Sequence, residues 1–579
     1  MDHRVMYDTK LIDIETTGLN PFAEGAAILQ LGYVDSKGVH VCHLADVDPY
    51  GWKATLHRVT SRWKYVGGHN VKFDLVWLRH FGVELEAVYD TMIEAHLVNS
   101  ERSVSLKSLM ADEMGGDWTY QGSWDGSDSE GMARYLVKDL IATKKLHELN
   151  LKQLTKAQKN LHDKVIIPVL NTLVGSEHAG ILVSRDKLEY TREKTQEDIN
   201  QCLDKLLEYV PESIPRDMDI KWGTTGFQRW LLFDHLGIEP TEIGKPTKSW
   251  PEGAPSMSSK ALSKIDHPIV AHIRELSRLN KVNSGFIGPY TEQLSPESRL
   301  YTSFRMAGTR TGRLSSGSLV PNKGKQKGFG INLQQVPKNP LIRGLMVAPE
   351  GYKVLEADFS QLELRVAAAL SGDEAMLEVY RQNGDIHHET ATALGHGVSV
   401  ARVKAKAVNF GFLYGMSART FVEFAKVSYG EDVPMDEAEA FREAYFSRFP
   451  GLRPWHARAK RWAHKHGYAQ TLFGRRRYLP DLESPDPGDV ALAERQAVNT
   501  PVQGTGSDCL MMAIARLSKM NIPDCSIFGL VHDSVLMYVP QENATEIGET
   551  VKSVMETPIK GLNVPLVADV NISDCWGGN

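Results

Sequence analysis

The sequence predicts a multidomain fold that combines α/β and α+β parts, and three observations lead to it. The chain has 579 residues, too many for one ordinary hydrophobic core. Short β-like runs such as Leu11–Ile14 alternate with helical stretches up to about residue 145, and strands and helices alternate again from about residue 300. Between these regions, residues 186–210 repeat apolar positions at helix spacing. We therefore expect domain boundaries near residues 150 and 300.

The composition argues against several classes of protein. Its 42% hydrophobic and 24% charged residues are those of a folded globular chain. The apolar runs fall well short of the roughly 20 residues that a membrane span needs, and the N-terminus lacks the apolar core of a signal peptide. Five scattered cysteines without a C-x-x-C pair argue against a zinc ribbon or a disulfide framework, and they favour a reducing cytoplasm.

The net charge of −6 is weak evidence against a nucleic-acid partner, because binding depends on where basic residues cluster rather than on their sum. A chain that uses many carboxylates to hold metal ions would also be acidic overall. The sequence has no G-x-x-x-x-G-K-[ST] motif, which argues against a P-loop motor.

A first group of polar residues lies in the N-terminal region. LIDIETTGL places Asp13 and Glu15 two apart on a predicted strand, so both side chains point to one face. GHNVKFDL places Asp74 at the start of a helical pattern, and YLVKD places Tyr135 and Asp139 four apart on one helix face. Neighbouring like charges cost free energy unless a cation lies between them.

Each of these motifs alone has an ordinary structural interpretation: a surface strand, a helix cap at Asn70 or a common side-chain pair. Together, and in this order, they resemble the DEDD 3′–5′ exonucleases whose last motif is Tyr-x-x-x-Asp, over about residues 8–150. The resemblance implies two divalent ions, with Tyr135 orienting the attacking water. The ligands would be Asp13, Glu15, Asp74 and Asp139. Oxygen-only ligands suit Mg²⁺, with Mn²⁺ as an alternative.

A second pair of carboxylates lies far apart in the sequence. In IFGLVHDSVLMYV, Asp533 stands between two apolar runs, where an aspartate is usually a turn former. In YKVLEADFSQLELR, Asp358 ends a predicted strand, and helical periodicity begins after Ser360. We expect both aspartates to lie where water is scarce. Because an unpaired buried carboxylate is costly, we also expect a shared pair of metal ions.

A third motif, ARVKAKAVNFGFLYG, repeats Arg402, Lys406, Phe410 and Tyr414 every four residues, which forms a slanted stripe on a helix. Cations followed by aromatic rings suit a nucleotide, whose triphosphate and base they would contact. A solvated cationic flank over an aromatic core is an equally good interpretation of this helix alone.

DFSQLELR, R-x-x-x-K-x-x-x-F-G-x-x-Y-G and VHD, in this order, resemble motifs A, B and C of family A DNA polymerases of the DNA polymerase I type. RTGRLSS, DIH, TLFGRRRYLPDL and RQAVNTPVQGT match as well. The resemblance implies an RNase H-like exonuclease domain followed by a right-hand polymerase with an antiparallel palm sheet. The domains would be the exonuclease at 1–150, the thumb at 151–300, the palm at 301–371 and 486–579, and the fingers at 372–485.

The same resemblance implies residue roles. Asp358 and Asp533 would hold two catalytic metals. Arg402 and Lys406 would bind the incoming triphosphate, and Lys406 would also protonate the pyrophosphate. The remaining nucleotide contacts would be Gln361, Glu363, His387, Phe410 and Tyr414, and the DNA contacts Arg313, Arg495, Asn499, Gln503 and His532. Minor-groove acceptors occur on every base pair, so such contacts test pair shape without reading sequence.

Two of these positions carry specific hypotheses. Glu363 would exclude a 2′-hydroxyl, although Ser360-x-x-Glu363 is also a capping box, with Ser360 as the N-cap; both roles can coexist. Phenylalanine at 410 implies discrimination against dideoxynucleotides, whose sugar lacks a polar partner.

Three features depart from the family pattern or carry no assigned role. Residues 316–331 form an insertion with Lys323, Lys325 and Lys327, which is either a solvated loop or a DNA phosphate contact. Ser534 stands where many relatives carry glutamate, which implies two essential carboxylates rather than three. Arg475–Arg477 are expected to form a solvated or phosphate-facing strip.

The expected function is template-directed DNA synthesis with 3′–5′ proofreading, and the expected partners are primer-template DNA and deoxynucleoside triphosphates. The chain starts in the proofreading domain, which favours a phage-type enzyme in the host cytoplasm. We expect a monomer without a membrane partner; a replisome or processivity partner is left open. Two alternatives stay in view: a 3′–5′ exonuclease with a vestigial polymerase domain, and a non-catalytic DNA-binding replication factor.

Overall fold

The computed structural model describes residues 9–44, 51–115, 128–215, 219–320, 328–395 and 400–578. The chain divides into two compact units. The first comprises Met1–Ile181, Tyr301–Gln335 and Ala348–Asn579, and the second comprises Leu182–Leu300 and Val336–Val347. The three lysines of the insertion lie outside the described residues, so the hypothesis about them stays a prediction.

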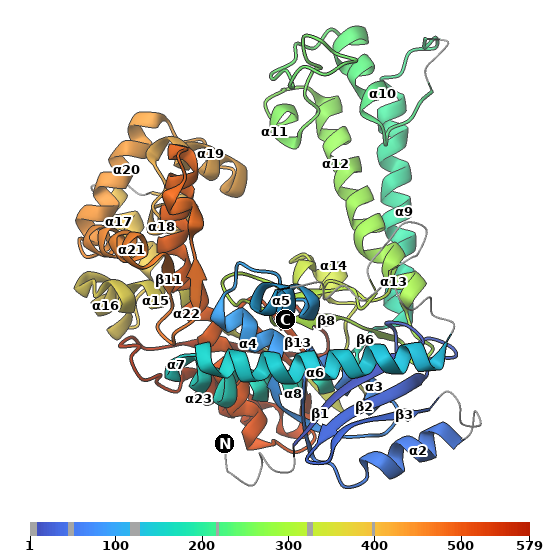
Figure 1. Cartoon of the computed structure of the whole chain (residues 1–579). Helices are drawn as coiled ribbons and strands as arrows, with labels where there is room; N and C mark the ends of the chain where they lie inside the picture. The colour runs from blue at the N-terminus through green and yellow to red at the C-terminus, as the bar shows by residue number, and fades with distance from the viewer. Residues whose placement is uncertain are drawn as a thin grey trace. The chain divides into compact units, whose positions relative to one another are not determined.

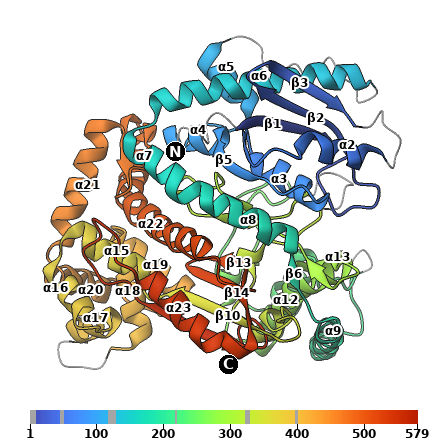
Figure 2. The ribbon, with the colours of Figure 1, turned by 90° about the horizontal axis from the view of Figure 1, so that it is seen from below.

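A five-stranded sheet with the order β3-β2-β1-β4-β5 forms the N-terminal part of the first unit. Strand β1 is antiparallel to β2 and parallel to β4. Helix α6 runs along this sheet (Figures 1 and 2), and Leu136 and Leu140 pack so closely on Gly32 that a Cβ there would lie 2.7–2.8 Å from them. The elements are β1 (Lys10–Thr16), β2 (Ile28–Asp35), β3 (Gly38–His43), α2 (Gly51–Thr60), β4 (Tyr65–Gly68), α3 (Val71–His80), β5 (Glu86–Asp90), α4 (Thr91–Val98), α5 (Leu106–Met114) and α6 (Ser129–Gln153).

A helical connection joins this sheet to the rest of the first unit. It consists of α7 (Lys156–Leu161), the π-helical turn η2 (His162–Ile166) and α8 (Ile167–Ala179). A capping box of Thr155 and Gln158 starts α7. Helix α8 packs against α3 and β5 and also against strand β13, so it contacts both sheets of the first unit.

The second sheet has the order β13-β14-β10-β15 and is antiparallel throughout, as predicted. Strand β10 lies between β14 and β15, and helix α23 packs on β10 and β15. The elements are β10 (Tyr352–Phe359), β13 (Ser526–Val531), β14 (Ser534–Pro540), α23 (Ala544–Glu556) and β15 (Ala568–Ser573), with the short elements β8 (Ser303–Arg305), β9 (Ser315–Gly317), η5 (Leu333–Gln335) and η7 (Gln541–Asn543).

A helical segment follows β10 in the chain and returns to the sheet through α22. The carboxylate of buried Asp373 accepts hydrogen bonds from the amide of Met376 at 2.9 Å and from the amide of Gly451 at 2.6 Å. It therefore fixes the early turns of this helical segment. The elements are α15 (Leu362–Ser371), α16 (Glu374–Arg381), α17 (Ile386–Gly395), α18 (Arg402–Leu413), α19 (Ala418–Tyr429), α20 (Met435–Arg448), α21 (Leu452–His466), β11 (Tyr468–Gln470), β12 (Arg476–Tyr478), η6 (Pro480–Glu483) and α22 (Pro487–Met520).

The second unit is built on two long packed helices, α9 and α12 (Figure 1). The predicted helix at 186–210 is α9, whose core positions include Ile199 and Leu206. The elements of the second unit are β6 (Ile181–Leu182), α9 (Arg185–Leu207), α10 (Thr225–Arg229), η3 (Trp230–His235), α11 (Ser259–Leu262), α12 (Pro268–Val282), η4 (Asn283–Ile287), α13 (Gly288–Gln293), β7 (Arg299–Leu300) and α14 (Pro340–Arg343). None of the helices in the described part of the chain has the length and hydropathy of a membrane span.

Candidate active sites

The structure brings the five predicted polar residues of the N-terminal part together, as the N-terminal cluster. Strand β1 carries Asp13 and Glu15, helix α3 carries Asp74, and helix α6 carries Tyr135 and Asp139. The amide of Ile14 donates to Asp74 Oδ1 at 3.0 Å, which ties the start of α3 to β1. Strand alternation and helical spacing thus converge on one site, as the motifs predicted.

Burial, and after it charge repulsion, raises the pKa values of the carboxyl groups in this cluster. Burial raises the pKa of Asp13 well above its ordinary value, and the charges of Asp74, Asp139 and Glu15 raise it further. Burial and the charge of Asp139 raise the pKa of Glu15 to about 7, against an opposing effect of Lys107. Burial likewise raises the pKa of Asp74.

The donor set fits a divalent cation whose coordination is completed from outside the protein. Within the described residues, no three His, Cys, Asp or Glu side chains form a ready-made metal cage. Mg²⁺ usually keeps several waters and takes one or two carboxylates together with phosphate oxygens. The N-terminal cluster supplies carboxylates that repel one another, which is the repulsion that such an ion relieves.

The helix that carries Asp74 is fixed by a residue that the motifs did not reveal. Asn70 precedes α3 with φ 55°, but its side chain makes no capping hydrogen bond, so the structure does not support the alternative interpretation of Asn70 as a side-chain cap. The carboxylate of buried Asp90 accepts instead from the amides of Asn70 and Val71, both at 3.0 Å, and from Met92 at 2.9 Å. One carboxylate therefore caps both α3 and α4. The available sequence signal was an aspartate directly before a helix.

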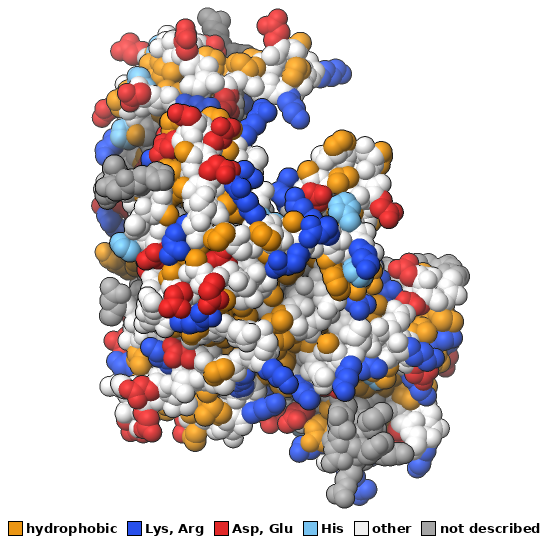
Figure 3. All heavy atoms as spheres, turned by 90° about the vertical axis from the view of Figure 1, so that its left-hand side faces the viewer, with side chains coloured by type: hydrophobic (Ala, Val, Ile, Leu, Met, Phe, Trp, Pro, Cys, Tyr) orange, Lys and Arg blue, Asp and Glu red, His pale blue; other side chains and the backbone are white. Residues whose placement is uncertain are grey.

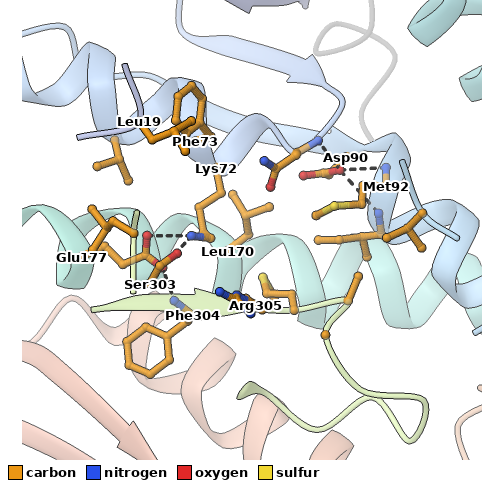
Figure 4. Close-up of a pocket in the computed structure, with 18 of the residues that line it drawn as sticks. Leu19, Lys72, Phe73, Asp90, Met92, Leu170, Glu177, Ser303, Phe304 and Arg305 are labelled. Atoms are coloured by element: carbon orange, nitrogen blue, oxygen red, sulfur yellow. Dashed lines mark hydrogen bonds and ion pairs between the residues drawn. The ribbon is translucent and has the colours of Figure 1, made fainter. Parts of the chain in front are cut away.

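A cavity of ≈ 390 Å³ is lined in part by residues of α3 that precede Asp74 in the sequence (Figure 4). Leu19 and Phe73 line it from the N-terminal part, and residues 303–308 line it from β8 and the following turn. Lys72 and Glu177 point toward each other at its wall, with Nζ 2.6 Å from both carboxylate oxygens. The cavity wall therefore combines apolar side chains with a buried ion pair.

Folding also brings the two distant aspartates together, as the central pair, Asp358 and Asp533. Asp358 lies opposite Ser534 in the β10–β14 register, and Ser534 Oγ donates to Asp358 Oδ1 at 2.9 Å. The amide of Phe359 donates to the carbonyl oxygen of Asp533 at 3.3 Å. The charge of Asp358 is among the causes that raise the pKa of Asp533, after burial.

The prediction that both aspartates lie where water is scarce is wrong for Asp358, which is exposed; Asp533 is half-buried. Alternation along β10 turns Ala357 and Phe359 into the core and Asp358 to the other face. Strand β15 places Asp569 opposite Asp358 in the register. This third carboxylate could not be found from motifs, because only sheet assembly brings β15 beside β10.

The turn that presents Asp533 is tight. Val531 pairs with Ser534, so only two residues connect β13 and β14, and His532 adopts φ 54°. A pocket of ≈ 160 Å³ at this turn is lined by residues from four segments of the first unit. They include Arg313, Gln334, Ser507, His532 and Asp533. Two of the predicted DNA contacts, Arg313 and His532, thus lie beside the central pair.

Glu363 takes part in a polar network rather than a capping box. The residue before α15 is Gln361 with φ 55°, not Ser360, and no side chain caps this helix, so the capping-box interpretation is wrong. The Glu363 carboxylate accepts hydrogen bonds from the Arg313 guanidinium and the Tyr414 hydroxyl. Burial and then the charge of Asp533 raise the pKa of Glu363 to about 7.

Helix α18 presents the predicted stripe outward. Arg402 and Lys406 are exposed and Phe410 and Tyr414 are half-buried, while Phe412 is fully buried on the opposite face. The aromatic residues of the stripe are therefore not core residues, which favours the nucleotide interpretation over the solvated flank.

Asp385 organises the surroundings of this stripe. Its Oδ2 accepts from Arg402 Nε at 3.0 Å and Nη2 at 2.8 Å, and its Oδ1 accepts from the amide of His387 at 2.9 Å and from Gln361 Nε2 at 3.4 Å. Burial, with Arg402 and Lys406, lowers the pKa of His387 to about 4, so this ring is neutral at pH 7. Asp385 thus links three of the predicted nucleotide residues, Gln361, His387 and Arg402.

The other predicted DNA contacts follow one face of α22. Arg495 is exposed, and Asn499 and Gln503 are half-buried, each four residues after the one before. On the face drawn in Figure 3, Lys and Arg side chains are interspersed with Asp and Glu. The net charge therefore says little about any local site.

The prediction that Arg475–Arg477 form a solvated or phosphate-facing strip is wrong for Arg475. Arg475 is buried, and its Nε donates to Asp508 Oδ1, also buried, at 2.7 Å. Arg477 Nε lies 2.8 Å from Glu101 Oε1, from the N-terminal part. Carboxylates from two other segments, invisible in the local sequence, bind these two guanidinium groups.

The N-terminal part also contacts the loop that carries Arg313. Glu101 Oε2 lies 2.8 Å from Arg310 Nε, and His96 Nε2 lies 2.9 Å from the carbonyl oxygen of Thr309. Burial lowers the pKa of His96 to about 4, so the neutral ring donates this hydrogen bond. The two sites are therefore connected through a defined interface within the first unit.

A sheet domain with clustered carboxylates, joined to an antiparallel sheet with paired aspartates, is the class of fold found in enzymes that make and break phosphodiester bonds. Residues 185–578 match the family described as DNA polymerase family A, and residues 11–150 match the 3′–5′ exonuclease family. The chain therefore belongs to DNA polymerase family A and carries a 3′–5′ exonuclease domain.

Relatives from several bacteria support this assignment. The thermostable DNA polymerase I of Thermus aquaticus is 38% identical over 358 residues, which cover 60% of this chain and 40% of the relative. That of Thermus thermophilus is 31% identical over 546 residues, covering 91% and 60%. The DNA polymerase I of Aquifex aeolicus is 29% identical over 595 residues, covering 98% and 95%. The chain thus matches about two fifths to three fifths of the length of the Thermus relatives.

A solved structure has the same fold over almost the whole chain. It is the POL domain of Pol1 from M. smegmatis in complex with a DNA primer-template and dNTP. The TM-score is 0.81 at 24% identity, and the match covers 99% of this chain and 96% of that one. At this identity the comparison shows the fold.

Proposed function

We propose that this protein is a DNA-dependent DNA polymerase with a 3′–5′ proofreading exonuclease. The observation that carries the proposal is the presence of both carboxylate sites in one family A chain: the N-terminal cluster and the central pair. The solved relative that holds primer-template and dNTP supports the same partners here. The phage assignment, the cytoplasmic location and the monomeric state stay predictions.

In the polymerase reaction, the primer 3′-oxygen forms a bond to the α-phosphorus of the nucleotide, and pyrophosphate leaves. Two bound Mg²⁺ ions would promote loss of the 3′-hydroxyl proton and neutralise the pyrophosphate charge. Asp358 and Asp533 supply the carboxylates that hold them, and Ser534 orients Asp358 through its 2.9 Å hydrogen bond. Exposed Arg402 and Lys406 bind the triphosphate, and Lys406 donates a proton to the departing pyrophosphate.

Selection of the sugar depends on Glu363. Arg313 and Tyr414 hold its carboxylate in one place beside the central pair. A 2′-hydroxyl would meet this fixed group, whereas a deoxyribose would not. Arg313, Arg495, Asn499, Gln503 and His532 would contact the DNA, and His387 and Gln361 would line the nucleotide pocket with Phe410 and Tyr414.

In the exonuclease reaction, water attacks the last phosphodiester, the bond from phosphorus to the 3′-oxygen breaks, and a nucleoside monophosphate leaves. Asp13, Glu15, Asp74 and Asp139 would hold the divalent ions, and Tyr135 would orient the water. The apolar wall of the cavity at Leu19 and Phe73 suits a terminal base, and Arg305 in the same cavity suits a phosphate.

Primer extension with Asp13→Ala and Asp533→Ala tests this proposal. We expect Asp533→Ala to lose extension and keep degradation of single-stranded DNA, and Asp13→Ala to do the reverse. Unmutated protein that degrades DNA without extending a primer would indicate an exonuclease with a vestigial polymerase domain. Protein with neither activity would indicate a DNA-binding factor.

A further inference from the structure

The hairpin loop that carries Arg313 is held by residues of the exonuclease domain. Strands β8 and β9 pair with each other, and residues 306–314 form the β8–β9 loop between them. Within this loop, the Thr309 hydroxyl donates to the carbonyl oxygen of Arg313 at 2.7 Å. Because of this hydrogen bond, a contact that fixes Thr309 also fixes the backbone of Arg313, whose guanidinium binds Glu363.

Thr309 is held in turn by a residue of α4. The Nε2 of His96 lies 2.9 Å from the Thr309 carbonyl oxygen, and His96 is only 4% exposed. A carbonyl oxygen can only accept, so the ring carries a proton on Nε2 and donates it. Because His96 is buried, this hydrogen bond is shielded from competition with water.

The segment that follows α4 makes a second contact to the same loop. Glu101 places one carboxylate oxygen 2.8 Å from Arg310 Nε, in the loop, and the other 2.8 Å from Arg477 Nε, on β12. The side chains of Glu101 and Arg477 are 20% and 11% exposed, whereas that of Arg310 is 60% exposed. Because exposed ion pairs contribute little, we expect His96 to hold the loop more firmly than Glu101 does.

The other side of the loop rests on the polymerase part of the chain. Gly312 has φ 79°, and a Cβ there would lie 2.6 Å from the Nε of buried Arg475. The Gly312 carbonyl oxygen accepts from Ser507 Oγ, on α22, at 2.9 Å. The loop is therefore held from both sides, by α4 of the exonuclease domain and by α22.

We propose that His96, assisted by Glu101, is a positioning residue for sugar selection, which holds the β8–β9 loop so that Arg313 fixes the Glu363 carboxylate. This inference rests on the proposed polymerase function and on the role proposed there for Glu363. A steric group excludes a 2′-hydroxyl only while its neighbours prevent it from moving aside. The exonuclease domain thus takes part in nucleotide selection as well as in proofreading.

Arg313 is also a predicted DNA contact, which gives the loop a second reasonable role. If His96 acted through primer-template binding, its loss would lower kcat/KM for ribonucleotides and deoxynucleotides by the same factor. If it acts through Glu363, its loss changes the ratio of the two values, and the change disappears once Glu363 is removed. The ratio and its dependence on Glu363 therefore separate the two roles.

The test measures kcat/KM for a ribonucleotide and for the matching deoxynucleotide in an Asp13→Ala background, where proofreading does not interfere. We expect His96→Leu to raise the ratio of ribonucleotide to deoxynucleotide incorporation by roughly 3–10-fold, and Glu101→Gln to raise it less. His96→Gln, whose side-chain amide can donate in place of Nε2, should restore most of the discrimination. In a protein that already carries Glu363→Ala, His96→Leu should change the ratio no further.

Glu113→Gln is the matched control for Glu101→Gln. Glu113 forms an ion pair with Arg102 at 2.6 Å, with the two side chains 17% and 18% exposed, and both residues belong to the N-terminal part. Its loss should leave the ratio unchanged. Deoxynucleotide incorporation by each variant reports folding, and if His96→Leu does not fold, the ratios of His96→Gln and Glu101→Gln decide.

The outcomes separate the inference from the function on which it rests. If the Asp13→Ala protein extends no primer, the proposed function fails. If it extends primers but the variants at His96 and Glu101 leave the ratio unchanged, the inference is overturned. It is overturned as well if His96→Leu adds its full effect to that of Glu363→Ala, or if Glu113→Gln shifts the ratio as much as Glu101→Gln does.

Discussion

The two carboxylate sites of this chain meet the same electrostatic problem in different ways. At the N-terminal cluster, Asp13 is surrounded by three other carboxylates, and each raises its pKa. At the central pair, Arg313 and His532 oppose the effects of burial and of Asp358 on the pKa of Asp533. The effect of Arg313 therefore partly offsets the rise in the pKa of Asp533, and we expect the N-terminal cluster to depend more on a bound ion.

Glu15 and Glu363 give the comparison in its simplest form. Burial raises the pKa of each to about 7. The next cause is Asp139 for Glu15 and Asp533 for Glu363, but only Glu363 accepts hydrogen bonds from both a guanidinium and a phenol. The same direction of pKa change thus accompanies a proposed metal ligand in one site and a proposed steric group in the other.

The largest expected effect is on the selection of deoxynucleotides over ribonucleotides by Glu363. In an Asp13→Ala background, which prevents proofreading from masking the result, Glu363→Ala should raise ribonucleotide incorporation relative to deoxynucleotide by roughly 10²-fold. The measurement is the ratio of kcat/KM values for the two nucleotides. If the variant discriminates against ribonucleotides as well as the unmutated protein does, Glu363 does not exclude the 2′-hydroxyl, and its contrast with Glu15 is lost.

An intermediate effect is expected at Phe410, which lies half-buried on α18 with its ring centroid 6.1 Å from that of His387. Phe410→Tyr adds a hydroxyl that can serve as a polar partner near the triphosphate of a dideoxynucleotide. The kcat/KM for a dideoxynucleotide relative to a deoxynucleotide should rise by roughly 10-fold or more. A variant that still rejects chain terminators would contradict this reading of the stripe.

The smallest effect concerns stability without metal. Because the pKa of Glu15 is raised from 4.5 to about 7, the folded state binds a proton that the unfolded chain releases, and stability falls as pH rises through this interval. In a chelator at pH 8, Glu15→Gln should raise Tm by roughly 1–3 °C, and Mg²⁺ should abolish the gain.

Two further variants serve as controls for the Tm of Glu15→Gln. Asp358→Asn removes an exposed carboxylate and should leave Tm within about 1 °C, and Glu148→Gln on the exposed face of α6 is the matched surface control. A gain at Asp358 as large as that at Glu15 would show that the two sites do not differ in dependence on a bound ion.

Local sequence patterns could predict the motif residues because strand alternation and helix spacing decide which side chains share a face. Asp13 and Glu15, or Arg402 through Tyr414, needed no tertiary information. The antiparallel sheet was predicted through the family resemblance. The meeting of Asp358 with Asp533 was expected first from the cost of burying an unpaired carboxylate, although Asp358 is exposed, and then from the resemblance as well.

The rest depended on contacts between distant segments. Asp569 reaches Asp358 only when β15 joins the sheet, and Asp508 neutralises Arg475 only when α22 packs beside it. Lys107 and Asp90 belong to helix starts whose partners come from other elements. The capping box at Ser360 failed because Gln361, in a left-handed conformation, starts the helix instead.

The buried ion pair beside the cavity has a consequence for shortening the chain. Lys72, on α3, and Glu177, on α8, have side chains only 10% and 3% exposed. A fragment that starts after the exonuclease residues would delete this lysine together with the rest of α3, and it would uncover the face of α8 on which Glu177 lies. The carboxylate would then meet water in place of its cation, while the amide of Phe304, which donates to it at 2.6 Å, would stay in the fragment.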